Sequence, residues 1–144
     1  LSRLLLGLLQ LILLFVTGKI LFGFYYGQNI PALLLISILF CGSITGISLL
    51  LGSLIRQEEI LIVASILMAN LMGALGGCWW PIELVSPTMR TVSYLFPTGW
   101  IMDAYHKLIF FGASWSEIRI HFFVLGAFTL VFLFASIRFF RWKK

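Results

Sequence analysis

The chain has 144 residues, of which 61% are hydrophobic and 10% are charged, and its formal net charge at pH 7 is +5. A soluble domain carries about 25% charged residues, so this composition excludes an ordinary soluble domain. The positive charge does not indicate nucleic-acid binding, because several basic residues gather after the last apolar run, where membrane anchors lie: Arg138, Arg141, Lys143 and Lys144.

Four apolar segments are predicted to cross a membrane, at about residues 4–26, 31–55, 60–80 and 115–140. Each is close to the ~20 residues that a helix needs to cross a bilayer core. Lipid offers no hydrogen-bond partner to backbone that is not helical. The expected fold class is therefore an all-α membrane protein, with residues 1–144 forming a single transmembrane domain.

Residues 76–114 interrupt this pattern with glycines, tryptophans and three prolines. Trp79 and Trp80 suit the membrane–water interface where the third span should end, and Pro81 would stop that helix. A serine followed by a proline at position 87 is typical of a helix N-cap and first helical residue. A further helix and the last span are expected to follow.

Two short helices are predicted in this region, over about residues 87–96 and 100–111, with a break at residues 97–99. At 1.5 Å per residue each would be roughly 15–20 Å long, which is too short to cross the bilayer. Both are too apolar for a loop in water, so we expect a re-entrant pair on the outer side. Two helices lying flat in the interface are the alternative. Ser114 and Glu117 have capping-box spacing and are expected to begin the last span.

Small and polar residues inside the spans indicate where helices pack. Gly42 and Gly46 in the second span, and Gly73 in the third, allow close approach of a neighbouring helix. That neighbour could belong to the same chain or to a second subunit. Asn70 is predicted either to make an interhelical hydrogen bond or to line a substrate path.

Charged residues in the second short helix have a simple explanation. Asp103 and Lys107 are separated by four residues, so we expect an ion pair that supports the helix. A proton or substrate role for His106 is the alternative.

No catalytic, cofactor-binding or metal-binding motif is identified in the sequence, which lacks the GxxxxGK[ST] phosphate loop. We therefore expect that the chain is not itself an enzyme. Glu58 and Glu59 resemble part of an intramembrane protease motif, but Val63 stands where that motif needs arginine. His106 and His121 are predicted on the opposite side of the membrane, beyond reach for proton transfer. A structural or assembly subunit of a membrane complex is the stronger alternative.

The spacing of residues 76–104 resembles the ABC-2 type transporter permease family. The residues that carry this resemblance are Gly76, Gly77, Trp80, Pro81, Glu83, Pro87, Phe96, Pro97, Trp100 and Ala104. The resemblance implies that the four spans are the last four of six, so we expect that two N-terminal spans are missing from this chain.

The resemblance also implies partners and a function. Permeases of this family pair as homodimers or heterodimers, and separate nucleotide-binding subunits bind ATP and Mg and hydrolyse the ATP. They mostly export drugs, lipids, glycans or other amphipathic substrates, in bacteria across the plasma membrane. By resemblance the polar turn contacts the ATPase, although it could also be a solvated turn: Arg56, Gln57, Glu58 and Glu59.

An outer gate of the transport path is expected at the re-entrant pair. The candidate residues are Gly77, Trp80, Pro81, Glu83, Pro87, Pro97, Gly99 and Trp100.

The distribution of basic residues predicts the orientation in the membrane. Lys and Arg are in excess on the side that holds both ends of the chain and the turn at residues 56–59, so this side is expected in the cytoplasm. In full-length protein lacking Cys41 and Cys78, a cysteine introduced at Ser114 should react with an impermeant external reagent. A cysteine at Glu58 should not react, and external labelling at position 58 would contradict this orientation.

Overall fold

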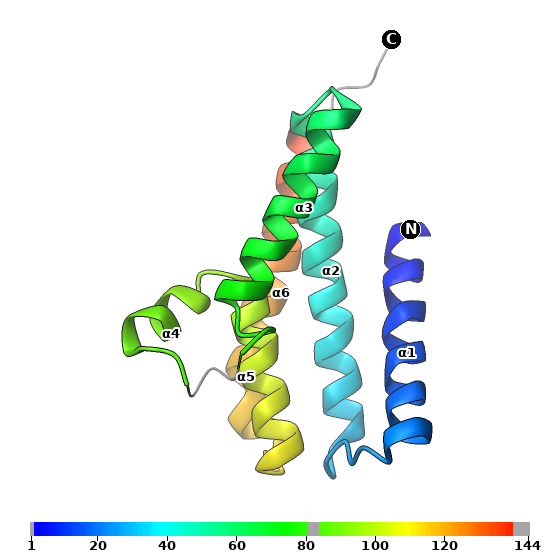
Figure 1. Cartoon of the computed structure of the whole chain (residues 1–144), viewed down its shortest axis with the longest axis vertical. Coiled ribbons are helices and arrows are strands. Elements are labelled where there is room, and N and C mark those ends of the chain that lie inside the picture. The colour runs from blue at the N-terminus through cyan, green and yellow to red at the C-terminus, as the bar shows by residue number, and fades with distance from the viewer. Residues whose placement is uncertain (1, 81–83, 140–144) are drawn as a thin grey trace.

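The computed structural model of the chain describes residues 2–80 and 84–139. In this part of the chain the regular elements are helices, drawn in Figure 1: α1 Ser2–Phe22, α2 Ile30–Leu54, α3 Glu58–Leu75, α4 Pro87–Ser93, α5 Pro97–Phe110 and α6 Trp115–Phe139. Helices α1, α2, α3 and α6 are long and apolar enough to cross a membrane. The prediction of an all-α, multi-pass membrane protein is therefore confirmed.

The helices form an elongated bundle around α2 (Figure 1). α3 lies along the upper part of this bundle and α5 along its lower part, while α4 projects to one side between them. α2 contacts every helix except the short α4. The chain therefore descends through α3, turns sideways through α4, and continues downward in α5.

The closest contact in the bundle is between α2 and α6, at two glycines of α2. A Cβ at Gly42 would lie 2.8 Å from Cγ2 of Thr129, and one at Gly46 would lie 2.8 Å from Cβ of Phe132. Cβ atoms do not normally approach other atoms this closely, so both positions require glycine at the present helix separation. The small-residue spacing in α2 thus serves packing within this chain.

Hydroxyl groups add polar contacts to the same interface. Thr129 of α6 donates to the carbonyl oxygen of Leu39 at 2.9 Å, and Ser43 of α2 donates to that of Leu125 at 3.1 Å. The two hydroxyl oxygens are 3.0 Å apart. Such bonds hold helices together where lipid provides no hydrophobic driving force.

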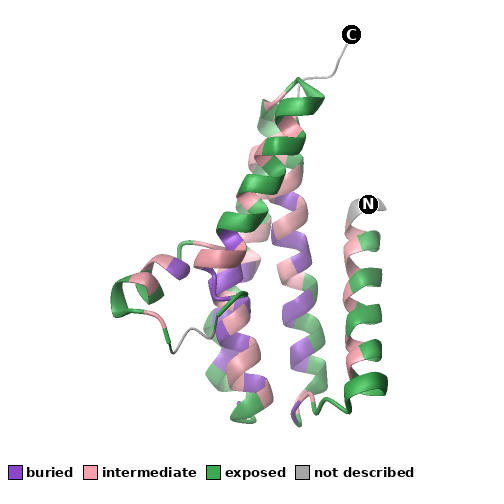
Figure 2. Ribbon diagram, viewed as in Figure 1, coloured by how far each residue is buried: buried purple, intermediate pink, exposed green. Residues whose placement is uncertain are grey.

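Helix α5 completes the core by packing against both α2 and α6. The Tyr105 hydroxyl of α5 lies 2.7 Å from the Ser37 hydroxyl of α2. Figure 2 shows the buried residues concentrated on α2 and α5, whereas α1 and α3 are largely uncovered. The buried apolar cluster consists of Ala32, Leu33, Ile36, Ile101, Ala104, Leu108, Ala113, Ile118 and Leu125.

Two spans end earlier than the sequence predicted. α1 ends at Phe22, because Gly23 adopts φ +62°, a conformation that favours glycine. α3 ends at Leu75, and Gly77 with φ +80° turns the chain so that the Cys78 amide donates to the Gly73 carbonyl at 3.0 Å. This is a Schellman-type end, so the chain has left the helix before it reaches Trp79 and Trp80.

The predicted break at residues 97–99 was wrong in position. Pro97 is the first residue of α5, where a missing N–H has no helical partner to lose. The interruption lies between Ser93, the last residue of α4, and Phe96, which is the N-cap of α5. Proline here begins the helix that we expected it to interrupt.

Replacing Gly46 by alanine tests the α2–α6 contact. Alanine favours a helix over glycine by ~1 kcal/mol, but at Gly46 its methyl group would overlap Phe132. We expect a net loss of about 1–2 kcal/mol in the free energy of unfolding. The measurement is thermal unfolding of the full-length protein in detergent.

Gly52→Ala is the matched control, because Gly52 lies on the same helix and a Cβ added there would have no atom within 4 Å. This variant should be neutral or more stable. Equal destabilisation by both substitutions would contradict the packing argument.

Candidate functional site at the α4, α5 and α6 end of the bundle

A buried cluster of three ionisable side chains joins α5 to α6. The carboxylate of Asp103 accepts hydrogen bonds at one oxygen, Oδ2, from Nε2 of His121 at 2.7 Å and from Nζ of Lys107 at 2.9 Å. Asp103 is 5% exposed and His121 is 1% exposed, whereas the Lys107 side chain is 41% exposed. The cluster therefore runs from the core of the bundle to its surface.

All three side chains of the cluster come from helices, Asp103 and Lys107 from α5 and His121 from α6. Asp103 and Lys107 are one turn apart on α5, so their side chains lie on the same face, and the predicted ion pair forms. The His121 side chain reaches Asp103 because α6 packs against α5. The ring of Trp100 meets the His121 ring edge-on, with centroids 5.5 Å apart, and donates its Nε1 hydrogen to the carbonyl oxygen of Tyr94 at 2.7 Å.

The surroundings of Asp103 keep it ionised. Burial by itself raises the pKa of a carboxyl group, but the hydrogen bonds from His121 and Lys107, and the positive charge of Lys107, outweigh it and lower the pKa of Asp103 to about 2. The Nδ1 atom of His121 is buried and has no hydrogen-bond partner in the described structure. The hydrogen on Nε2 is therefore the one that His121 donates, to the ionised carboxylate of Asp103.

The cluster holds two helices of the bundle together. No group of three metal-ligating side chains occurs among the described residues. No serine or cysteine is bonded to His121 there. A hydrogen bond to an ionised carboxylate is stronger than one between neutral groups, so the Asp103–His121 bond, at 2.7 Å, fixes α5 against α6.

The end of α3 is tied directly to the start of α5. The Thr98 hydroxyl donates to the carbonyl oxygen of Met72 at 2.8 Å and is buried. A side chain at Gly76 would overlap Thr98. The glycines that end α3 thus allow the first turn of α5 to pack against them.

The residues predicted for the outer gate gather only in part. Gly77 and Trp100 lie near the junction of α3, α4 and α5, and Pro97 and Gly99 form the first turn of α5. A Cβ at Gly99 would overlap the carbonyl oxygen of Ser93, so this glycine allows α4 and α5 to meet closely.

The remaining gate candidates lie at the edge of this junction. Pro87 is the first helical residue of α4, with Ser86 as its N-cap at 3.3 Å from the Met89 amide, as predicted. Trp80 is 48% exposed, next to Trp79. Pro81 and Glu83 lie outside the described residues.

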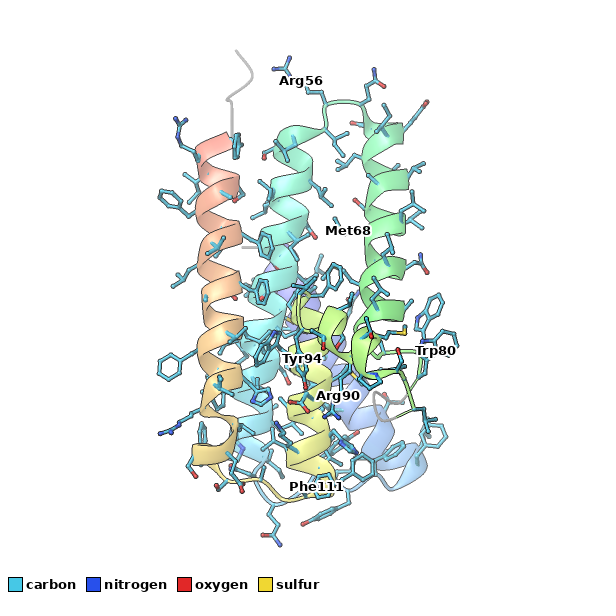
Figure 3. All side chains as sticks on the ribbon, turned by 90° about the vertical axis from the view of Figure 1, so that its left-hand side faces the viewer. Arg56, Met68, Trp80, Arg90, Tyr94 and Phe111 are labelled. Atoms are coloured by element: carbon cyan, nitrogen blue, oxygen red, sulfur yellow. The ribbon has the colours of Figure 1, made fainter. Side chains whose placement is uncertain are left out.

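The polar turn lies at the opposite end of the bundle. Figure 3 shows Arg56 at the top, with Arg90 and Phe111 toward the bottom. Arg56 and Gln57 connect α2 to α3, and Glu58 and Glu59 form the first turn of α3. All four are exposed. The structure thus separates the candidate ATPase contacts from the candidate gate by the length of α3, about 27 Å for 18 residues.

Asn70 makes its hydrogen bond within its own helix. Its Nδ2 donates to the carbonyl oxygen of Ile66 at 2.7 Å on an exposed face of α3. Gly73, on the same helix, is covered by the Trp79 ring, whose Nε1 would lie 3.3 Å from a Cβ there. Within the described residues Asn70 therefore faces away from the bundle.

The bond between Asp103 and His121 was not predicted from the sequence. His121 lies near the start of the apolar run 120–137, and this was a usable signal, because ionisable residues inside a membrane span require a partner. The sequence did not show which acid would meet it, since the partner lies 18 residues away on another helix.

The chain belongs to the ABC-2 family of transporter proteins. A family model described as "ABC-2 family transporter protein" matches residues 1–138, which confirms the predicted resemblance. The chain is 27% identical over 139 residues to the linearmycin resistance permease protein LnrN of Bacillus subtilis (strain 168). This match covers 96% of the chain and 34% of LnrN, so the chain spans about a third of that relative's length. No solved structure matches the chain.

Replacing Asp103 by asparagine tests the cluster. The pKa of Asp103 falls from 3.8 to about 2 on folding. Its contribution to stability is therefore present above about pH 4 and lost as the pH falls toward 2. We expect Asp103→Asn to lower the free energy of unfolding at pH 7 by about 2 kcal/mol.

Thermal unfolding of the full-length protein from pH 7 to pH 3 measures this effect. The difference between wild type and Asp103→Asn should narrow at the acid end. Glu58→Gln is the control, because Glu58 is exposed and lies at the other end of α3. A difference between wild type and Asp103→Asn that stays constant with pH would contradict the argument.

Proposed function

We propose that this chain is part of the permease subunit of an ABC-2 exporter. The family match over residues 1–138 carries the proposal, together with four helices able to cross a membrane. The relative described as a linearmycin resistance permease supports a role in resistance. The cargo proposed is an amphipathic compound such as a drug, a lipid or a glycan.

The energy for transport would come from a separate subunit. The sequence has no phosphate loop, so we propose that the chain is not an enzyme and binds no cofactor. ATP and Mg would be bound by a partner ATPase. The exposed acidic pair Glu58 and Glu59, at the start of α3, offers a contact for a basic surface on that partner.

A mechanical connection runs from this turn to the other end of the bundle. α3 begins at the acidic pair and ends at the Thr98–Met72 hydrogen bond, which joins it to α5. The Asp103–His121 bond then joins α5 to α6. A movement of the turn would therefore displace α5, and the region around α4 and α5 would open or close.

The uncovered helices indicate where other parts of the transporter would pack. The apolar stretch of α1 has no residue buried, and that of α3 has 6%. We propose that a second permease copy and the remainder of the full-length subunit cover these faces. In this assembly α4 and α5 would form a re-entrant pair at the outer mouth, with the termini and Arg56 in the cytoplasm.

Charge reversal at the turn tests the coupling. In full-length permease reconstituted with its ATPase, Glu58→Lys with Glu59→Lys should lower substrate-stimulated ATP hydrolysis at least about tenfold, because two acidic contacts are replaced by repulsion. Membrane insertion and the unfolding temperature should be unchanged, since both side chains are exposed.

Gln28→Lys is the control variant, because Gln28 is exposed in the turn between α1 and α2, at the other end of the bundle. Unchanged coupling in the double variant would remove the turn from the mechanism. A wild-type protein that neither binds an ATPase nor stimulates it would favour an assembly subunit.

A further inference from the structure

A cavity lies beside the buried cluster, between α4, α5 and α6. Its volume is about 580 Å³, within the ~300–1,000 Å³ typical of small-molecule sites. Ionisable side chains from all three helices line it, so it is unlike the apolar surfaces elsewhere on the bundle. The lining residues are Arg90, Asp103, His106, Lys107, Phe111, Ala113 and Glu117.

Two of the charged side chains in this cavity already compensate each other. Asp103 and Lys107 form an ion pair, and Asp103 also accepts a hydrogen bond from Nε2 of His121. Arg90 makes no hydrogen bond or ion pair with any side chain in the described structure, and it is exposed. Glu117 uses one oxygen, Oε2, to accept from the amide and hydroxyl of Ser114. Among the Arg, Lys, Asp and Glu side chains that line the cavity in the described structure, Arg90 and Glu117 are therefore the two without an ion pair.

The hydrogen-bonding groups that remain available are donors on the basic side chains and an acceptor on Glu117. The guanidinium of Arg90 offers a planar set of donors that suits phosphate oxygens. Lys107 spends one N–H on Asp103 and is exposed enough to offer the others. The second carboxylate oxygen of Glu117 can accept from an ammonium group. The matching ligand carries a phosphate and a primary amine.

The surface next to the cavity is apolar, so it could contact the hydrocarbon part of an amphipathic ligand. Phe111 lines the cavity and is 74% exposed, and Phe110 beside it is equally exposed. Figure 3 places Phe111 at the end of the bundle away from Arg56, and Arg90 in the same half of the bundle as Phe111. A headgroup bound in the cavity could therefore leave acyl chains against these rings.

We propose that this cavity binds the phosphoethanolamine headgroup of a phospholipid. Arg90 and Lys107 hold the phosphate, and Glu117 accepts a hydrogen bond from the amine. The site is independent of the transport proposal, because it requires neither an ATPase nor a substrate path. A lipid bound here would join α4, which has few other contacts, to α5 and α6.

Native mass spectrometry of the delipidated full-length protein tests the proposal. Phosphatidylethanolamine, phosphatidylcholine and phosphatidylglycerol with identical acyl chains are added in equal amounts. Phosphatidylethanolamine should bind about tenfold more tightly than the other two, because choline offers no N–H donor and glycerol no positive charge. Equal retention of the three lipids would overturn the proposal.

Two variants identify the contacts. Arg90→Gln should weaken phosphatidylethanolamine binding about tenfold through loss of a charged hydrogen bond, while Arg119→Gln, an exposed arginine outside the cavity, should not. Glu117→Gln should remove the preference for ethanolamine over choline and keep the α6 cap, because glutamine also serves in a capping box. Equal losses from Arg90→Gln and Arg119→Gln would contradict the site.

Free phosphoethanolamine distinguishes a lipid from a soluble ligand. At the concentration of lipid used, it should not displace phosphatidylethanolamine, because it lacks the acyl chains that contact Phe110 and Phe111. Displacement at equal concentration would show that the cavity takes a soluble phosphate ester, and would overturn the assignment to lipid.

Discussion

The close approach of α2 and α6 at Gly42 and Gly46 is the constraint on which the rest of the bundle depends. In lipid, apolar side chains gain little by leaving one apolar surface for another, so helix association relies on packing and on interhelical hydrogen bonds. Both occur here, because the glycines let the backbones approach and the Ser43 and Thr129 hydroxyls then reach across. With the two helices fixed at this distance, α5 can fit against both.

The position of α5 follows from this pair and from its own polar groups. Tyr105 bonds to α2 and Asp103 bonds to α6, so one helix that is too short to cross a membrane is fixed on two sides. A buried carboxylate without a partner would be costly, and the two donors that Asp103 receives remove that cost. α5 is too short to be held in place by crossing the bilayer, so its hydrogen bonds to α2 and α6 fix its position.

The sequence predicted the parts of this structure that depend on local chemistry. Runs of apolar residues predicted the four spans, and Ser86 followed by Pro87 predicted the start of α4. The positions that failed depend on contacts between distant segments. Pro97 permits either a break or a first helical turn; in the structure it begins α5, whose first turn packs closely against Ser93 at Gly99. Predicting the Asp103–His121 bond would have required knowing which face of α6 packs against α5. The cavity arises from three helices at once, and no local pattern of residues contains it.

The resulting bundle is unevenly held, and this bears on how it could move. α2, α5 and α6 share the core and several side-chain bonds, whereas α3 is attached chiefly at its ends: to α2 through the turn at Arg56, and to α5 through Thr98. In the proposed mechanism α3 would tilt as a rigid body, and the core would stay intact because it contains no residue of α3. A tilt of α3 would first displace Gly76 and Thr98, where α3 contacts α5. In the mechanism that we propose, the Thr98–Met72 bond would be the point at which a movement at one end of α3 passes to the other end of the bundle.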